Sequence, residues 1–275
     1  AAAWDSLRQH GIAATGQRVF TTTTLGSTET APLAMTANWD ADEPGILGLP
    51  VPGVELKLVS NERKLELRVR GPNITPGYWR QPDATAQAFD DEGWYCMGDA
   101  VRFADPANVD RGLVFDGRIA EDFKLSTGTW VNVGPLRTTA NSALSPLVRD
   151  VCITGHDRDE VGLLIFPEFE ACRKLCDLPE TASNEEIVQS EALRREIQKR
   201  LDTIAATGTS SSNRITRAIV LAEPLTDVEV TDKATLSFNV VLERRRQDIV
   251  ELYEAPNSPR VLLATAPLET QEARS

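Results

Sequence analysis

Two kinds of hydrophobic pattern divide this 275-residue chain and constrain its fold more than any single motif. Up to about residue 116, apolar and polar residues alternate, as in VELKLV and KLELRVRG. This alternation predicts strands with one buried and one solvent-exposed face. After Arg118, short apolar runs such as EVGLLIFP are separated by longer segments with helical spacing. That pattern predicts buried strands between helices. The expected fold class is therefore mixed α/β, with a β-rich part followed by an α/β part.

Turn-forming residues set the expected elements of the first part. The stretch 42–53 is dense in Gly and Pro and predicts a loop, and the two alternating runs after it predict a hairpin turned at SNER. A short helix is expected after Pro82, because Asp83 would lie near its positive end. Strands are also expected at 21–24 and in GWYCMGDAVRF and RGLVFDGR, and a helix in the opening segment AAAWDSLRQHG.

The second part contains three buried-strand candidates, in VRDVCITG, EVGLLIFP and RAIVLAEP. One long helix is expected over 184–206 and a last helix over 235–253. The end of the chain is expected to form a disordered tail. The expected domains are 1–116, with a β-rich subdomain over 43–116, then 117–255, then the tail 256–275.

Charge and cysteine usage narrow the classes of partner. With 29 Lys and Arg against 41 Asp and Glu, the net charge is −12, which argues against nucleic acid or an anionic membrane surface as partner. The four cysteines lack CxxC spacing and the chain has only two histidines, so neither a zinc site nor a disulfide framework is expected. A small-molecule partner and a cytoplasmic location are predicted, and no pattern predicts an oligomeric state.

The stretch TTTTLGSTETAP, residues 21–32, allows two interpretations. Its β-branched threonines favour a strand that runs into a Gly-Ser turn. Its crowd of hydroxyl groups around one glycine and one glutamate would also suit phosphate oxygens, because hydroxyls donate hydrogen bonds. The stretch alone does not decide between the two.

Four short motifs follow one another along the chain: LGSTET (25–30), KLELRVRGPNITPGYW (64–79), WYCMGD (94–99) and GRIAEDFKLSTGTWV (117–131). In this order they resemble the later motifs of adenylate-forming enzymes, which include acyl-CoA synthetases, luciferases and peptide-synthetase adenylation domains. FKLSTGTWVNVGPLR resembles the feruloyl-CoA synthetase subfamily most. The resemblance implies the end of a large N-terminal domain with a β-rich subdomain, followed by a small α/β C-terminal lid domain. It also implies activation of an aromatic acid such as ferulate with ATP and transfer of the acyl group to coenzyme A.

The resemblance assigns the phosphate end of an ATP site to one turn. Gly26, Ser27 and Thr28 are implied to bind ATP or AMP, with the Thr28 hydroxyl donating to a phosphate oxygen. Glu29 is implied to supply a hard oxygen ligand to Mg²⁺. The family often has an aromatic residue before the glycine, against the adenine, but this chain has Leu25.

Two further residues are implied to bind the nucleotide. Asp99 matches the aspartate that accepts hydrogen bonds from both ribose hydroxyls, although a plain turn aspartate is the alternative. Arg118 matches an arginine near the ribose and phosphate, although a surface salt bridge is the alternative.

The resemblance also implies a hinge and a coenzyme A tunnel. The hinge falls at 118–122, where Ala120 stands in place of the family's usual Asp or Lys and is followed by Glu121. Lys124 matches a lysine that faces the active site in a second conformation, with a solvated charge on a strand as the alternative. The turn that the resemblance places along the pantetheine arm consists of Gly128, Thr129 and Trp130.

Two departures separate the chain from a typical member. The family's lid lysine stands in Gly-Lys-Ile, whereas here Thr235 takes its place and Lys233 comes two residues early. The family's main phosphate loop should precede LGSTET and is not found in residues 1–20, so an upstream segment is expected. The alternatives are another acyl-CoA ligase or adenylation domain, or a truncated module that has lost the chemistry.

Overall fold

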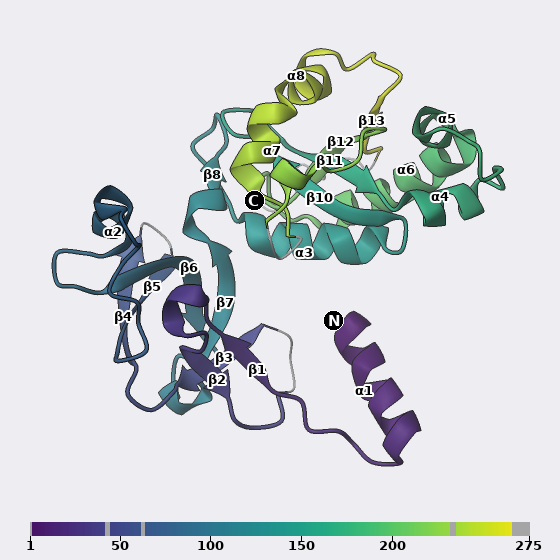
Figure 1. The fold of residues 1–275 in the computed structure, drawn as a ribbon. Coiled ribbons are helices and arrows are strands. Elements are labelled where there is room, and N and C mark those ends of the chain that lie inside the picture. The colour runs from purple at the N-terminus through teal and green to yellow at the C-terminus, as the bar shows by residue number, and fades with distance from the viewer. Residues whose placement is uncertain (1, 42–44, 62–63, 232–234, 266–275) are drawn as a thin grey trace, which may run out of the picture. The chain divides into compact units, whose positions relative to one another are not determined.

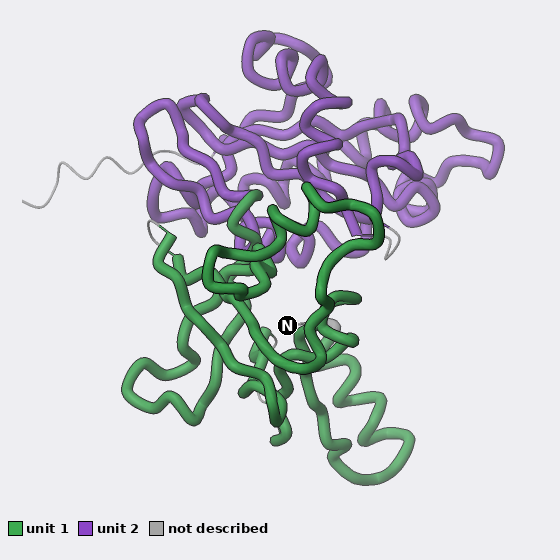
Figure 2. The backbone as a smooth tube through the Cα atoms, turned by 60° about the vertical axis from the view of Figure 1, so that its left-hand side comes forward, with its two compact units in different colours: residues 1–120 green, residues 121–275 purple. Residues whose placement is uncertain are grey.

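A computed structural model describes residues 2–41, 45–61, 64–231 and 235–265. The chain divides into two compact units, residues 1–120 and residues 121–275 (Figure 2). Each unit has a hydrophobic core of its own. The boundary expected from the sequence, between residues 116 and 117, falls inside the last strand of the first unit, whereas the units divide after Ala120.

The first unit is built on one antiparallel sheet with the strand order β1-β2-β3-β7-β6-β5-β4 (Figure 1). Its strands are β1 (Thr23–Leu25), β2 (Met35–Ala37), β3 (Ile46–Pro50), β4 (Glu55–Asn61), β5 (Lys64–Arg70), β6 (Tyr95–Phe103) and β7 (Leu113–Arg118). Helix α1 (Ala2–Thr15) precedes the sheet, and α2 (Pro82–Ala88) lies between β5 and β6.

The alternating runs form the hairpin that their pattern predicts. Strands β4 and β5 pair antiparallel from Glu55 opposite Arg70 to Asn61 opposite Lys64. Leu67 and Val69 are buried in the core of this unit. Helix α2 begins at Pro82, as predicted, because proline lacks an N–H that the first helical position does not need.

The prediction of a loop over 42–53 is wrong for its centre. Strand β3 runs through it and pairs with β2 and β7. Gly48 has φ +80°, and a Cβ there would lie 2.0 Å from the carbonyl oxygen of Thr36, so the glycine lets two strands approach closely. Sheet pairing thus outweighs the local preference of a Gly- and Pro-rich sequence; residues 42–44 lie outside the described part.

The second unit combines a four-stranded sheet with helices on both sides. The sheet order is β10-β11-β12-β13, in which only β11 and β12 run parallel. Figure 1 shows α3 and α8 on opposite sides of this sheet. The elements are β8 (Phe123–Lys124), β9 (Trp130–Val131), α3 (Val133–Leu144), β10 (Val148–Thr154), β11 (Val161–Pro167), α4 (Phe169–Leu175), α5 (Asn184–Gln189), α6 (Glu191–Thr207), β12 (Ile215–Val220), α7 (Phe238–Arg244), α8 (Arg246–Glu254) and β13 (Val261–Leu263).

Burial explains why the continuous apolar runs form the centre of this sheet. Every residue of β11 is buried, as the run EVGLLIFP predicts for a strand covered on both faces. Helices α3 and α6 pack against each other, and Leu136 of α3 and Ile197 of α6 belong to the same core.

Both long helices predicted here are interrupted. Ser190, with φ −57° and ψ 128°, ends α5 and begins α6. Arg245 separates α7 from α8, and its side chain forms a buried ion pair with Glu229. Apolar residues keep helical spacing across each break, so the spacing does not reveal the single residue at which each helix is interrupted.

The predicted disordered tail is wrong for its first residues. Residues 261–263 form β13, which pairs antiparallel with β12. The backbone N–H of Thr265 then donates to Asp202 Oδ1 over 2.8 Å. Val261 and Leu262 are buried, and this burial gives the segment a fixed place that its local composition does not suggest.

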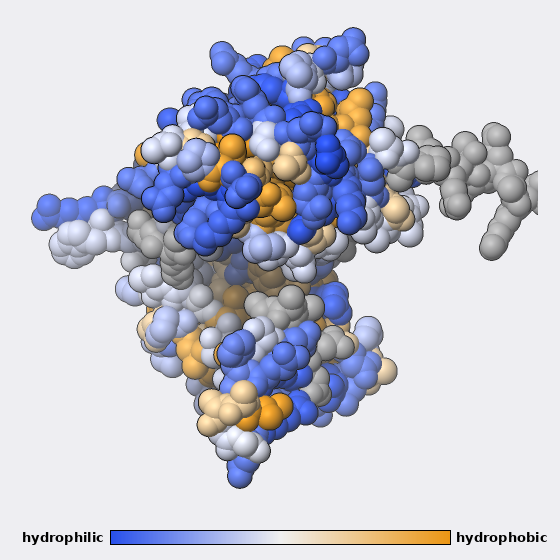
Figure 3. Space-filling model, turned by 90° about the vertical axis from the view of Figure 1, so that its right-hand side faces the viewer, coloured by the Kyte–Doolittle hydropathy of each residue, from blue (hydrophilic) through white to orange (hydrophobic). Residues whose placement is uncertain are grey.

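The face shown in Figure 3 carries mostly hydrophilic residues with small apolar patches between them. No helix in the described part of the chain has the length and apolar character needed to cross a bilayer.

Candidate functional site

A hollow of about 410 Å³ in the first unit brings together three residues that lie far apart in the sequence. Gly26 follows β1, Asp99 lies on β6 and Arg118 ends β7. The hollow is in the size range of small-molecule sites. These three lining residues were all expected to bind ATP, whereas Ser27, Thr28 and Glu29 lie farther along the turn and do not line it.

The register of the sheet sets Asp99 opposite Arg118. The two residues are direct partners across β6 and β7, and Arg118 Nε lies 3.5 Å from Asp99 Oδ1. The Asp99 side chain is 9% exposed and that of Arg118 is 63% exposed. Burial raises the pKa of Asp99, and the charge of Arg118 partly opposes that shift. The pair thus combines a buried carboxylate acceptor with an accessible guanidinium donor.

Gly26 is required by close packing. A Cβ at this position would lie 1.6 Å from the carbonyl oxygen of Pro32. The chain returns here, because the N–H of Ala34 donates to the Leu25 carbonyl over 2.9 Å as β2 begins. The glycine therefore lets the turn that follows β1 fold back tightly on itself.

Residues 28–30 form a single turn of 3₁₀ helix. Thr30 is buried and locks the turn, because its Oγ1 accepts from the Ser27 N–H over 2.8 Å and donates to the Ser27 carbonyl over 3.0 Å. The side chain of Thr28 is exposed, so its hydroxyl is available to a ligand. Of the strand expected over 21–24, only Thr23 and Thr24 lie in β1, which covers 23–25 and leads into this turn.

The Glu29 carboxylate lies among hydroxyl groups. Tyr78 Oη donates to Glu29 Oε1 over 2.9 Å. Burial opposes the charge of Glu29, but the nearby hydroxyls of Ser27 and Tyr78, together with its own backbone N–H, outweigh burial and lower its pKa. Ser27 Oγ is itself buried beside this carboxylate. An ionised carboxylate among hydroxyl oxygens fits a hard cation such as Mg²⁺.

The described residues contain no group of three or more His, Cys, Asp or Glu side chains placed to hold a metal ion. A magnesium ion at Glu29 would therefore take its other ligands from phosphate oxygens and water, which is how Mg²⁺ is commonly bound beside a nucleotide. Bound there, the ion would neutralise charge on the phosphates.

One aromatic residue of the hollow was not expected from the sequence. Phe115 lines it and is 40% exposed, which is unusual for a phenylalanine on a sheet. Leu25, which replaces the family's aromatic residue, lines the same hollow. Phe115 lies on β7, the strand that ends at Arg118. The register of this strand, and no feature of the sequence RGLVFDGR, shows that Phe115 lines the hollow.

Lys124, Gly128, Thr129 and Trp130 come together in the second unit on the two-stranded hairpin β8–β9. Lys124 and Trp130 are paired across its strands, and Lys124 Nζ lies 4.7 Å from the centroid of the Trp130 ring. Gly128 turns the chain with φ +78°, a conformation that favours glycine. The hairpin is tied to the loop between β10 and β11, since the Ser126 N–H donates to the Arg158 carbonyl over 2.9 Å.

The expected hinge falls at the boundary between the units. Ala120 ends the first unit and Glu121 begins the second, and both lie in a 3₁₀ turn over 119–121. Asp122 is fixed to the second unit, because its Oδ1 accepts from the Val133 N–H over 3.0 Å at the beginning of α3. Sequence inspection did not suggest this cap, which spans eleven residues.

Lys233 lies outside the described residues. On either side of it, Val230 and Leu236 form an antiparallel bridge, and the Thr231 N–H donates to the Thr235 carbonyl over 2.8 Å. Thr235 is exposed, and its hydroxyl lies 2.6 Å from that of Thr231.

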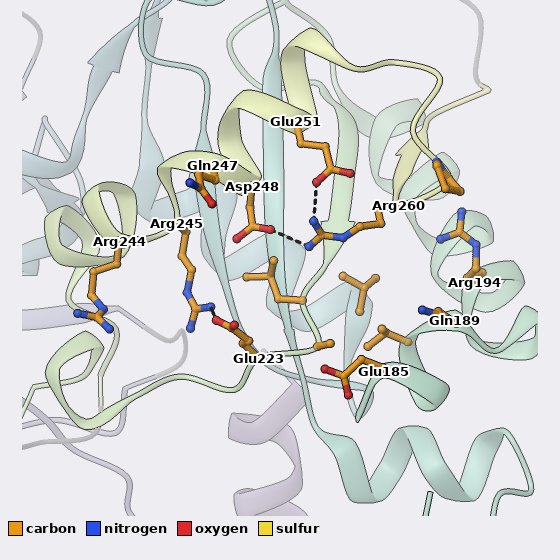
Figure 4. Close-up of a pocket in the computed structure, with 15 residues that line it drawn as sticks. Glu185, Gln189, Arg194, Glu223, Arg244, Arg245, Gln247, Asp248, Glu251 and Arg260 are labelled. Atoms are coloured by element: carbon orange, nitrogen blue, oxygen red, sulfur yellow. Dashed lines mark hydrogen bonds and ion pairs between the residues drawn. The ribbon is translucent and has the colours of Figure 1, made fainter. Parts of the chain in front are cut away.

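A larger cavity, of about 890 Å³, lies in the second unit at the end of β12 (Figure 4). It is lined by none of the residues expected for ATP or coenzyme A. Arg245 is paired with Glu223, and Arg260 with Asp248 and Glu251. These closed ion pairs hold the α7–α8 corner together and leave the first-unit hollow as the better candidate site.

Comparisons with known proteins bear on the family of the chain. Residues 121–257 match the family described as AMP-binding enzyme C-terminal domain. A probable acyl-activating enzyme 16 of Arabidopsis thaliana, chloroplastic, is 31% identical over 160 residues, which are 53% of this chain and 22% of that protein. A long-chain-fatty-acid–[acyl-carrier-protein] ligase of the same plant is 30% identical over 171 residues, which are 57% of this chain and 23% of that protein. The chain thus spans less than a quarter of the length of either relative.

Solved structures show the same fold. The adenylation domain of carboxylic acid reductase from Segniliparus rugosus, in complex with AMP and a co-purified carboxylic acid, has a TM-score of 0.66 at 24% identity. That match covers 91% of this chain and 37% of the other. ATP-bound MatB from Rhodopseudomonas palustris has a TM-score of 0.57 at 21% identity, covering 88% and 44%. The C-terminal unit thus matches an AMP-binding enzyme C-terminal domain, and the relatives support assignment of the chain to the adenylate-forming superfamily of acyl-activating enzymes and CoA ligases.

Proposed function

We propose that the chain is the C-terminal portion of an ATP-dependent acid–thiol ligase that activates a hydroxycinnamate such as ferulate and transfers it to coenzyme A. The observation that supports this most is the hollow shared by Gly26, Asp99 and Arg118. The ferulate assignment rests on the motif FKLSTGTWVNVGPLR.

In the first half-reaction a carboxylate oxygen of the acid attacks the α-phosphorus of ATP, and pyrophosphate leaves. Asp99 would accept hydrogen bonds from the ribose hydroxyls, and Arg118 would contact the ribose and the phosphate. Thr28 would donate to a phosphate oxygen. Phe115 would lie against the adenine in place of the aromatic residue that is Leu25 here. Each of these contacts fixes the nucleotide or offsets charge that develops as the bond forms.

In the second half-reaction the thiol of coenzyme A attacks the acyl carbonyl, its proton is lost, and AMP leaves. Lys124 would act in this step, and Gly128 would let the pantetheine arm pass close to the backbone. Rotation about Ala120 and Glu121 would separate the two half-reactions. We propose that Lys233 serves the first one as the lid lysine.

A carrier-protein thiol is the second candidate acceptor. One relative, at 30% identity, is named as an acyl-carrier-protein ligase. Both acceptors present the same phosphopantetheine thiol, so the β8–β9 hairpin suits either of them. Substrate discrimination is therefore a matter for experiment.

The test uses the protein encoded by the complete reading frame that contains this chain. Pyrophosphate release is measured with ferulate and with a long-chain fatty acid, and thioester formation with free coenzyme A and with a phosphopantetheinylated carrier protein. We expect ferulate to stimulate release and free coenzyme A to accept the acyl group. Pyrophosphate release stimulated only by the fatty acid would contradict the assignment of ferulate as substrate. Acyl transfer only to the carrier protein would contradict the assignment of coenzyme A as acceptor. AMP binding by the 275-residue chain itself, measured by calorimetry, separates a nucleotide site from a non-catalytic remnant, which would bind no AMP.

A further inference from the structure

The segment 73–78 is bound to residues 29–33 by four hydrogen bonds. Asn73 Nδ2 donates to the carbonyls of Thr30 and Leu33, each over 2.8 Å. The Thr75 N–H donates to the Glu29 carbonyl over 2.8 Å. Tyr78 Oη donates to Glu29 Oε1 over 2.9 Å. Three of these bonds fix the backbone of residues 29–33, and the fourth fixes the carboxylate of Glu29.

Tyr78 is in turn held by helix α2. Its backbone N–H donates to Thr85 Oγ1 over 2.9 Å, and Thr85 Oγ1 donates to the Gln81 carbonyl over 2.9 Å. The approach is close, because a Cβ on Gly77 would lie 2.4 Å from Thr85 Cγ2. The phenol therefore reaches Glu29 from a backbone with little freedom to move. The neighbouring Tyr95 is buried and packs edge-on against Phe89, which supports this corner of the sheet.

We propose that Tyr78 is a positioning residue that orients the Glu29 carboxylate toward a divalent cation held with the nucleotide. This inference rests on the proposed function. A carboxylate has about four lone-pair sites on its two oxygens, so one bond from a phenol leaves oxygen available to the cation. Partners of this kind, which hold a metal ligand in place without touching the metal, typically change metal affinity by about 10–100-fold when they are removed.

The simpler explanation is that the Tyr78–Glu29 bond only stabilises the fold. The two explanations differ in what they expect when Glu29 is already changed. If Tyr78 acts through Glu29, removing its hydroxyl has no further effect on cation binding once Glu29 is glutamine. If Tyr78 only stabilises the fold, its loss lowers the melting temperature equally in both backgrounds and leaves cation affinity unchanged.

The experiment uses the protein from the complete reading frame and Mn²⁺ as the probe. Mn²⁺ is titrated in the presence of saturating ATP by electron paramagnetic resonance, for the wild type, Tyr78→Phe, Glu29→Gln and the double variant. We expect Tyr78→Phe to raise the Mn²⁺ dissociation constant about 10-fold and the double variant to match Glu29→Gln. Tyr253→Phe, which removes a phenol bonded to Thr154 and Glu160 in the second unit, is the matched control and should bind Mn²⁺ as the wild type does.

A second measurement separates this inference from the proposed function. Acyl transfer from preformed feruloyl-adenylate to coenzyme A requires no cation at Glu29, so Tyr78→Phe should leave its rate unchanged. Wild-type affinity for Mn²⁺ in Tyr78→Phe, in a protein that forms the adenylate, would overturn the role of Tyr78 alone. Failure of the wild type to bind Mn²⁺ with ATP would overturn both proposals.

Discussion

Asp99 and Arg118 face each other across β6 and β7, with 3.5 Å between Arg118 Nε and Asp99 Oδ1. The carboxylate is buried while the guanidinium is mostly exposed, so the ion pair is solvated on one side only. Because water screens the exposed guanidinium, we expect the pair to contribute about 0–1 kcal/mol to stability.

Arg118→Ala should separate binding from stability. We expect the melting temperature of the first unit to change by less than about 2 °C, because a partly exposed ion pair contributes little. AMP affinity should fall about 10-fold, because a charge-assisted contact is lost. Calorimetry and a thermal melt on the same preparation test both expectations. Arg70→Ala, which removes an exposed pair with Glu55 on β4, is the control and should leave AMP affinity unchanged.

Glu229→Gln should destabilise the second unit, because the Glu229 carboxylate stabilises the fold. It is fully buried, accepts from Arg245 Nε over 2.7 Å and from the Thr226 N–H over 2.9 Å. Removing one partner of such a pair costs about 3–5 kcal/mol. We expect Glu229→Gln to lower the unfolding free energy of the second unit by that amount in urea at pH 7. Glu191→Gln, in an exposed pair with Arg195, should change it by less than about 0.5 kcal/mol.

The pH dependence of stability follows from the same pair. Burial would raise the pKa of Glu229, but Arg245 and Thr226 outweigh it, so its pKa is lowered on folding. A lowered pKa stabilises the folded state above the unfolded value of 4.5, and this stabilisation is lost as the pH falls through the folded value. Urea unfolding between pH 7 and pH 3 should therefore show a steeper loss in the wild type than in Glu229→Gln. Equal slopes in the two proteins would contradict the assignment.

Gly26→Ala should destabilise the first unit strongly. Its Cβ would meet the Pro32 carbonyl at 1.6 Å, and the backbone must move to relieve the contact. We expect a loss of about 3 kcal/mol. Gly93→Ala is the matched control, because Gly93 has φ +77° but open space around it. It should cost only about 1–2 kcal/mol, the cost of a left-handed residue. Urea denaturation followed by circular dichroism measures both losses, and equal losses would show that close packing is not what requires Gly26.

Asp122→Ala should loosen the beginning of α3. The helix's own N-cap residue, Asn132, makes no side-chain cap bond, and Asp122 caps Val133 instead. Loss of a cap costs about 1 kcal/mol. Hydrogen exchange at the Val133 amide should accelerate in Asp122→Ala and much less in Asp122→Asn, which keeps an acceptor oxygen. Unchanged protection in Asp122→Ala would mean that the cap does not form in solution.

Local sequence determined the elements whose side chains alternate or cluster along a short stretch. The β4–β5 hairpin, the buried strand β11 and the helix that begins at Pro82 follow from spacing and backbone chemistry alone. The same local signals missed β3, because its pairing depends on a close approach at Gly48 to a strand distant in the sequence. They also missed the breaks at Ser190 and Arg245 in the two long helices.

Motif order was enough to select Gly26, Asp99 and Arg118, but not to show that they share a hollow, which depends on the register between β6 and β7. Phe115, the Asp122 cap and the bond from Tyr78 to Glu29 came only from the tertiary structure. The physical reason is the same in each case. A residue's type and spacing fix what it can do chemically, whereas its partner across a sheet or a loop is fixed by packing that no short stretch encodes.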